Sequence, residues 1–299
     1  MSAPIDMVQV RDYFSRPERV QPSDFLRREI AARMHDRLEL VKIAPRRVLD
    51  AGCGAGADLA LLQKDFPAAQ IVGLDCAPAM SAAAQAPASR LGALNQFISK
   101  LLPAKAGVDL VCGDFADLPL GQNSLDLVWS NLALHWHPQP DRVFAEWRRT
   151  LRVDGLLMFS CFGPDTFKEL KAAFAAADAA PHALPFVDMH DFGDMLVDVG
   201  FSTPVLDMET ITVTYPTAAA LLADVRAWGG NPLATRRRGL MGKDAWGRML
   251  AALERTRRPD GTLGLSFEII YGHAFRPAPR VTAAGEAIIR FDLPRTPKK

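Results

Sequence analysis

The feature that most restricts the fold of this chain is the glycine-rich run VLDAGCGAG at residues 48–56. An apolar stretch leads into the run and the helix-like stretch ADLALLQKDF follows it, so we expect a turn between a strand and a helix. Glycine lets the backbone adopt positive φ and lets a ligand approach the main chain closely. The run therefore predicts a ligand site at the carboxyl edge of a sheet.

The order of the other segments predicts an α/β fold. Strand-like and helix-like segments alternate through the first half of the chain, which indicates a parallel sheet with helices on both faces. The strand-like segments after the run are AQIVGLD, VDLVCGD, SLDLVWSN and DGLLMFSCF, and the helix-like ones include PAMSAAAQA and DRVFAEWRRTL. In the second half, METITVTYP and LSFEIIYGHAF are typical of strands, and residues 217–258 are predicted to be helical and basic.

The chain divides into four parts at this level. We expect an N-terminal lid and helix over residues 1–44 and a ligand-binding core over 45–165. Residues 166–275 complete the core and add a helical, partly basic cap, and residues 276–299 form a flexible tail rich in Pro, Thr and Lys. The segment 86–107 reads as a helix-like insertion into the core.

Acidic residues stand at three successive strand ends. Asp50 closes the first strand, and Asp75 and Asp114 close the second and third. The carboxylate of Asp75, at the end of the second strand, can accept both hydroxyl hydrogens of a ribose. Asp114 can accept from an adenine amino group, with Phe115 flanking the ring.

Two cofactors and one structural alternative fit the glycine run. Gly52-x-Gly54-x-x-Ala57 also satisfies the dinucleotide fingerprint. Asp50 would repel a pyrophosphate, however, and no Lys or Arg stands near the loop after Arg47. The acids favour S-adenosylmethionine, which is cationic and carries an amino group, over a nicotinamide or flavin dinucleotide or a turn without ligand.

The motifs LDAGCGAG, GLD, GDFADLPL and SLDLVWSNLALHW resemble, in this order, those of class I S-adenosylmethionine-dependent methyltransferases. The resemblance covers roughly residues 45–165. It implies a Rossmann-like seven-stranded sheet of order 3-2-1-4-5-7-6 with an antiparallel last strand, for which LSFEIIYGHAF is the candidate. The cofactor-binding residues that it implies are Asp50, Gly52, Cys53, Gly54, Gly56, Asp75, Cys76, Asp114, Phe115 and Asn131.

A narrower resemblance covers about residues 10–275. SNLALHW, FGPDTFKELKAAF and PHALPF resemble the malonyl-acyl-carrier-protein O-methyltransferases of biotin synthesis. PHALPF, VDVGF and FEIIYGHAF also resemble a mitochondrial complex I assembly factor of the same superfamily, an arginine hydroxylase acting on a complex I subunit. The implied function is O-methylation of the free carboxylate of malonyl-acyl-carrier protein. The alternatives are action on a protein arginine and methylation of another small molecule.

The leading reaction requires no general base. A malonyl carboxylate is already ionised near neutral pH, so catalysis can rest on alignment and on removal of water. The candidate acceptor contacts are Tyr13, His135, Trp136, Tyr215 and Arg226. A packing role is the alternative for Trp136, and a frayed end is the alternative for Tyr13. We expect no metal site, because no third ligand stands near His135 and His137.

The charge balance excludes some classes of protein. The chain has 299 residues, 35 Lys and Arg against 34 Asp and Glu, and 49% apolar residues. Such a composition excludes a disordered chain and gives no support to a nucleic-acid binder. No apolar run approaches the roughly 18–20 residues that span a bilayer, and no signal or transit peptide is evident. Four cysteines without CxxC spacing fit a cytoplasmic protein.

Residues 226–258 hold nine basic residues and two acidic ones. Acyl carrier proteins are acidic, so this segment could bind one by ion pairing. A solvated helix face is the alternative. The residues that would form the docking surface are Arg236, Arg237, Arg238, Lys243 and Arg248.

Overall fold

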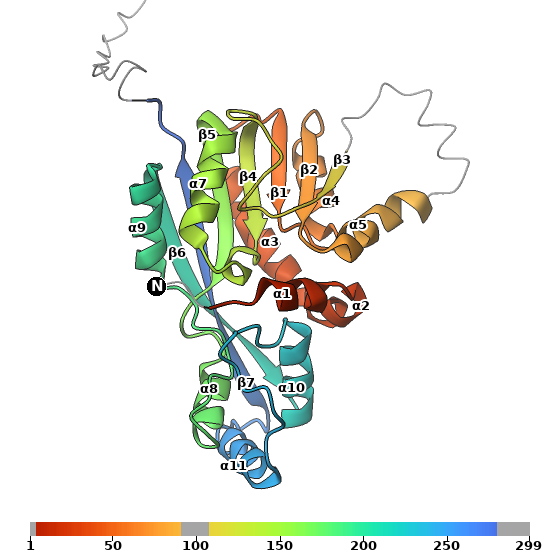
Figure 1. Cartoon of the computed structure of the whole chain (residues 1–299), viewed down its shortest axis with the longest axis vertical. Helices are drawn as coiled ribbons and strands as arrows, with labels where there is room; N and C mark the ends of the chain where they lie inside the picture. The colour runs from red at the N-terminus through yellow and green to blue at the C-terminus, as the bar shows by residue number, and fades with distance from the viewer. Residues whose placement is uncertain (1–3, 91–107, 280–299) are drawn as a thin grey trace, which may run out of the picture.

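A mixed seven-stranded sheet organises the molecule (Figure 1). The computed structural model describes residues 4–90 and 108–279. The strand order is β3-β2-β1-β4-β5-β7-β6, and β7 runs antiparallel to both of its neighbours, which confirms the predicted topology. The strands are β1 (Arg47–Ala51), β2 (Gln70–Asp75), β3 (Val108–Cys112), β4 (Leu125–Asn131), β5 (Leu151–Phe162), β6 (Ser202–Tyr215) and β7 (Leu263–Phe275).

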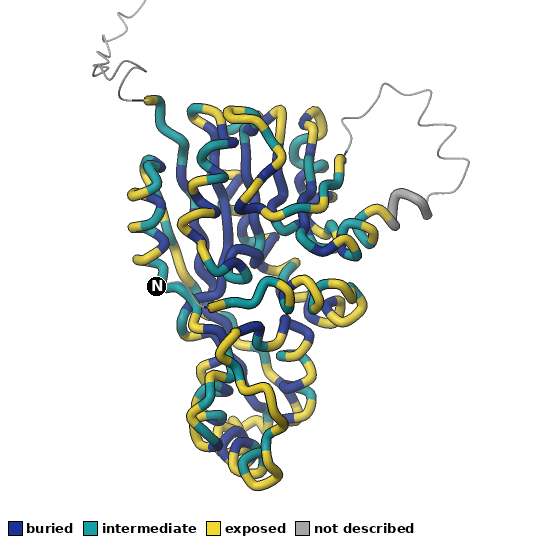
Figure 2. The backbone as a smooth tube through the Cα atoms, viewed as in Figure 1, coloured by how far each residue is buried: buried dark blue, intermediate teal, exposed yellow. Residues whose placement is uncertain are grey.

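Helices cover both faces of the sheet, and successive strand residues belong to two separate apolar layers. Val48 and Leu127 pack with α3 and α4, whereas Leu49 and Val128 pack with α7 and α9. Because both faces are buried, the central strands are apolar almost throughout and are dark along their length in Figure 2. The helices are α3 (Asp24–Glu39), α4 (Ala57–Asp65), α5 (Pro78–Arg90), α7 (Pro140–Thr150) and α9 (Met189–Val199).

The last two strands build a second lobe. Residues 263–268 of β7 pair with β6 alone, because β5 pairs with β7 only from Ile269 onward. Three helices pack around this extension in the lower half of Figure 1 and form the helical cap: α8 (Lys168–Ala175), α10 (Ala218–Ala227) and α11 (Lys243–Glu254). The cap therefore comes from two places in the chain, between β5 and β6 and between β6 and β7.

Residues 217–258 are less helical than the sequence suggested. Between α10 and α11 the chain is irregular, apart from a bridge at Leu233, and Gly229 and Gly230 both have positive φ. This glycine pair and the following Pro232 end α10, since neither favours a continuing helix.

The N-terminal segment, residues 4–23, joins the two lobes. It contains α1 (Met7–Phe14), α2 (Pro17–Val20) and the 3₁₀ turn η1 (Gln21–Ser23), and Figure 1 shows α1 and α2 between the sheet and the cap. The Asp6 amide donates to the Pro232 carbonyl at 2.9 Å, and the Ala234 amide donates to the Pro4 carbonyl at 2.8 Å. These bonds hold the start of the chain to the irregular stretch between α10 and α11.

Two predicted features fall largely outside the described residues. The expected insertion at 86–107 is described only as far as Arg90, where α5 ends, and the expected tail only over 276–279. Within residues 4–90 and 108–279, no helix is long and apolar enough to cross a membrane.

Candidate active site

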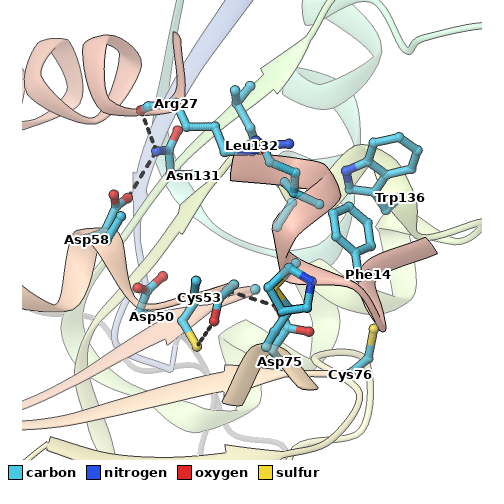
Figure 3. Close-up of a pocket in the computed structure, with 18 of the residues that line it drawn as sticks. Phe14, Arg27, Asp50, Cys53, Asp58, Asp75, Cys76, Asn131, Leu132 and Trp136 are labelled. Carbon is cyan, nitrogen blue, oxygen red and sulfur yellow. Dashed lines mark hydrogen bonds between the residues drawn. The ribbon is translucent and has the colours of Figure 1, made fainter. Parts of the chain in front are cut away.

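A cavity of about 420 Å³ opens at the carboxyl edge of the sheet (Figure 3). Its walls come from the loops that follow β1, β2, β3 and β4, and from the N-terminal segment with the start of α3. The predicted residues that line it are Asp50, Gly52, Cys53, Gly54, Asp75, Cys76, Asp114, Phe115 and Asn131. Gly56 lies behind this wall and begins α4 with a φ of 81°.

The glycine loop is shaped by a close backbone approach. Gly52 has a φ of 85°, and a Cβ atom there would lie 2.3 Å from the Ala133 Cβ, so only glycine fits. Most of the loop amides already have acceptors within the protein. Gly52 and Cys53 donate to the Leu74 carbonyl, and Gly54 donates to the Asp75 carboxylate. Few amides remain to bind a pyrophosphate, which disfavours a dinucleotide.

Asp75 is fixed in place at the end of β2. Its two carboxylate oxygens accept from the Gly54 amide at 3.0 Å and from the Ala77 amide at 2.8 Å. Burial raises the pKa of this carboxyl, and these two amide bonds oppose the rise. Each oxygen keeps a further lone pair, so Asp75 can still accept a pair of ribose hydroxyls.

Asp50 is the least satisfied acid in the cavity. Its side chain is 1% exposed, and its Oδ2 atom has no hydrogen-bond partner among the described residues. Burial raises the pKa of Asp50 well above its usual range, and the nearby Asp58 and Asp75 raise it further. A buried carboxylate without a partner is costly unless a cation arrives to pair with it.

Asp58, in the first turn of α4, is also buried and is close enough to raise the pKa of Asp50. Unlike Asp50, it has hydrogen-bond partners. It accepts from the Trp129 indole at 2.9 Å and from the Asn131 amide at 3.0 Å. Burial raises its pKa, and these two hydrogen bonds lower it. Asn131 in turn accepts from the Ser160 hydroxyl at 2.8 Å, so its polar atoms are engaged with the protein.

Comparison with known proteins agrees with this geometry. A family model described as a methyltransferase domain matches residues 49–159. A malonyl-[acyl-carrier protein] O-methyltransferase of Laribacter hongkongensis is 50% identical, covering 85% of this chain and 84% of that protein. An enzyme of the same name from Gallionella capsiferriformans is 46% identical over 96% of each chain.

The chain belongs to the malonyl-[acyl-carrier protein] O-methyltransferase family. It is a methyltransferase, and its cofactor is S-adenosylmethionine. The YcgJ protein of Bacillus subtilis, 13% identical, shares the fold with a TM-score of 0.55 over 82% of this chain and 98% of that one.

The methyltransferase cavity has hydrogen-bond acceptors that suit this cofactor. The cofactor carries a ribose, an adenine and a methionine end with an ammonium group. Asp75 is placed for the ribose, and Asp114 and Phe115 follow β3 where an adenine can lie. The unpartnered Oδ2 of Asp50 suits the ammonium group.

The residues predicted to contact the methyl-accepting substrate fall into two groups, those that line a cavity and those that do not. Trp136 lines the cofactor cavity and also a second cavity of about 170 Å³, where Arg226 lies too. Tyr13 does not line either cavity, and its hydroxyl donates to the Arg226 carbonyl. Tyr215 is buried in the cap, where its hydroxyl donates to Asp224.

His135 lies outside both cavities and inside an aromatic cluster. Its ring centroid is 4.7 Å from that of Phe162 and 4.9 Å from that of Trp136, and neither ring nitrogen has a partner among the described residues. Burial lowers the pKa of His135 to about 3, so the ring is neutral at physiological pH. In this position it supports Trp136.

Several residues of the cavity were not identified from the sequence. Arg27 and Phe14 come from the N-terminal helices, and Asp58 comes from the first turn of α4. The glycine loop itself could have indicated Asp58, because it stands two residues after Gly56. No local pattern marks Arg27 or Phe14, since the chain brings them to the site by tertiary folding alone.

We expect Asp75→Asn to weaken S-adenosylhomocysteine binding about 10- to 100-fold. The amide cannot accept from both ribose hydroxyls, and its NH₂ group can replace only part of the charge-assisted bonding. Isothermal titration calorimetry measures the loss, with Asp117→Asn at an exposed position as the matched control. Unchanged affinity in a folded Asp75→Asn protein would contradict the ribose assignment.

We expect Asp50→Asn to raise the thermal stability of the cofactor-free protein at pH 7 by about 2 °C or more. The folded pKa of Asp50 lies above its unfolded pKa, so its contribution to stability is present at low pH and is lost as the pH rises through the folded value. The difference in melting temperature between wild type and variant should therefore shrink as the pH is lowered.

The same change should weaken cofactor binding at pH 7. Wild-type affinity should also fall as acid protonates Asp50, whereas the affinity of the variant should depend less on pH. A variant that is less stable than wild type at pH 7, or that binds the cofactor normally, would contradict the role given to this carboxylate.

Proposed function

We propose that this methyltransferase transfers a methyl group to the free carboxylate of a malonyl thioester carried on an acyl carrier protein. Its relatives are named malonyl-[acyl-carrier protein] O-methyltransferases, which supports the proposal. The observation that carries the proposal is the second cavity, which meets the cofactor cavity at Trp136. Trp136 is the one residue that lines both cavities in the described part of the chain. An acceptor placed there lies beside the cofactor rather than in competition with it.

The second cavity suits a short acyl thioester. It lies between the end of β5 and the cap helices, and most of its lining is aromatic or aliphatic, including Phe162, Phe186 and Trp228. Such a surface can bind the methylene and thioester groups while it excludes water. Arg226, Asn231 and His182 are the polar residues of the lining, and Arg226 supplies a positive charge for a carboxylate.

The position of Trp136 depends on the cap. Its ring lies edge-to-face with Phe14, at a centroid distance of 5.5 Å, and a Cβ atom on Gly229 would lie 2.2 Å from it. Gly229 has a φ of 124°, which favours glycine, so the turn after α10 makes room for the indole. The wall between the two cavities is thus built by the core, the N-terminal segment and the cap together.

Methyl transfer to a carboxylate requires the side chains mainly to position the reacting groups. S-adenosylmethionine supplies a methyl group on a sulfonium, which a carboxylate oxygen can accept without any proton transfer. The neutral, enclosed His135 is accordingly not required as a base. The aromatic walls exclude water from the carboxylate, and the fixed residues hold it in line, which together account for acceleration without a catalytic triad.

The carrier protein would dock beside the second cavity. The stretch between α10 and α11 lines that cavity through Gly230 and Asn231, and a few residues later it exposes Arg237 and Arg238. A thioester attached to a carrier on this surface would have a short path to Trp136. An acidic carrier would complement the basic side chains, which favours this surface for docking.

Some of the predicted docking residues already bind other groups within the protein, so they are less available to a carrier. Arg237 forms an ion pair with Asp178 at 3.1 Å, and Arg236 donates to the Leu233 carbonyl at 2.9 Å. Arg248 donates to the Ala176 and Ala177 carbonyls at the end of α8. Arg238 and Lys243 are exposed, so we expect these two to contribute most to the encounter.

Purified protein should methylate malonyl-acyl-carrier protein with labelled S-adenosylmethionine, and its gene should restore growth of a strain that requires biotin. Intact mass of the carrier should show the gain of one methyl group. Succinyl-carrier protein, one methylene longer, is the matched control, and we expect slower turnover with it. If the malonyl carrier gains nothing and a protein arginine instead gains one oxygen, the alternative from the sequence replaces this proposal.

Charge reversal at Arg236, Arg237 and Arg238 should raise the Michaelis constant for the malonyl carrier roughly tenfold, because a surface that attracts an acidic carrier would then repel it. Binding of S-adenosylhomocysteine and the Michaelis constant for malonyl-coenzyme A should stay unchanged. The matched control reverses three exposed residues at the amino end of β1: Arg47 begins the strand, and Lys42 and Arg46 lie in the segment that leads into it. Equal effects of the two triple variants would argue against a docking surface.

A further inference from the structure

Arg27 is the one cationic side chain among the described residues that line the cofactor cavity. It belongs to the first turn of α3 and extends into the cavity (Figure 3). The same lining contains six acidic residues: Glu18, Asp24, Asp50, Asp58, Asp75 and Asp114. Any anionic group that enters this cavity therefore meets a strongly negative surface except at Arg27.

The guanidinium of Arg27 is held rigidly. Its Nη1 atom donates to the Ser23 hydroxyl at 2.7 Å and approaches Asp24 at 3.4 Å, and its Cζ atom lies over the Trp228 ring, 4.5 Å from the ring centroid. Asn131 at the end of β4 donates to the Arg27 carbonyl at 3.0 Å, which fixes the backbone as well. Arginine keeps its charge even where burial lowers its pKa, as it does here.

The guanidinium also has unused donors. All its hydrogen bonds to the described residues come from Nη1, so Nη2 and Nε remain for a ligand. A planar pair of N–H donors of this kind matches a carboxylate in a bidentate arrangement. Asp50 supplies the opposite partner in the same cavity, a carboxylate with an unpaired oxygen.

We propose that Arg27 binds the α-carboxylate of the methionine part of S-adenosylmethionine, while Asp50 binds its ammonium group. One fixed cation and one unpaired anion in a single cavity together recognise an amino acid zwitterion. Without Arg27, the cofactor carboxylate would be surrounded by acidic residues. This assignment concerns the cofactor only, and it holds whichever acceptor the enzyme uses.

The test separates a carboxylate contact from a structural role, because Arg27 also packs on Trp228. Binding of three ligands to Arg27→Met is measured by calorimetry: S-adenosylmethionine, decarboxylated S-adenosylmethionine and 5′-methylthioadenosine. The second ligand keeps both positive charges and lacks the carboxylate, and the third lacks the whole amino acid end. Arg28→Met is the matched control, since Arg28 is exposed on the same helix.

We expect Arg27→Met to lower the affinity for S-adenosylmethionine about 10- to 100-fold and to change the other two affinities less than about threefold. The affinity of Arg27→Lys for S-adenosylmethionine should lie between those of wild type and Arg27→Met, because lysine keeps the positive charge but cannot donate two parallel hydrogen bonds to a carboxylate. Wild type should prefer S-adenosylmethionine to its decarboxylated form, and Arg27→Met should lose that preference.

Two outcomes would overturn the assignment. An equal loss of affinity for all three ligands would mean that Arg27 only supports the fold of the cavity. Unchanged S-adenosylmethionine affinity, combined with a higher Michaelis constant for the acceptor, would assign the guanidinium to the acceptor carboxylate instead. Neither outcome depends on the malonyl proposal, since calorimetry with these ligands involves no acceptor.

Discussion

The buried carboxylate of Asp50 is the constraint on which the site depends. The chain keeps an acid with an unpaired oxygen at the end of β1, only 1% exposed. Burial raises the pKa of this carboxyl, and the nearby Asp58 and Asp75 raise it further. Such a group disfavours the folded state at neutral pH unless a cation compensates it. In the assignment proposed above, the ammonium group of the cofactor is that cation, so the electrostatic cost that weakens the free protein would favour the cofactor-bound one. Binding energy and folding energy are coupled through this one carboxylate.

The second constraint is geometric and lies in the N-terminal segment. Backbone hydrogen bonds tie Pro4 and Asp6 to the stretch between α10 and α11, and Phe14 contacts the Trp136 ring. The segment thereby closes the cofactor cavity and also fixes the wall of the second cavity. Docking of the carrier on the stretch that carries Arg237, as proposed above, would be connected to the cofactor cavity through these bonds.

The sequence predicted the parts of the fold and site that arise from local patterns. The glycine run and the acidic residues at the strand ends lie in contiguous segments whose turn chemistry and hydrophobic period are readable. The strand order came instead from the resemblance to class I methyltransferases. The comparisons and the structure confirm the cofactor and the sheet. The helical prediction over 217–258 was wrong for residues 228–242, because the glycine pair after α10 outweighs the apolar period around it.

The acceptor side could not be predicted in the same way. Tyr13 and Tyr215 have the residue types expected of a substrate wall, yet tertiary packing directs their hydroxyls to the Arg226 carbonyl and to Asp224. Arg27 has no motif around it, and its side chain is positioned by packing on Trp228, which lies about 200 residues later in the chain. Residue type shows what a side chain can do, whereas its partners decide what it does.

This difference between the two sides has a physical origin. The cofactor is bound by loops that directly follow strands, so a few residues in sequence bring their backbone and carboxylates to one edge of the sheet. The second cavity, where we propose that the acceptor binds, is enclosed by segments far apart in the chain, from Trp136 to Trp246. Trp136 also contacts Phe14 of the N-terminal segment. Because Gly229 must accommodate that indole, the shape of the acceptor cavity depends on backbone angles in the cap as much as on the residues that line it. Changes in the cap can therefore alter the shape of the second cavity and, through Trp136, the wall that it shares with the cofactor cavity.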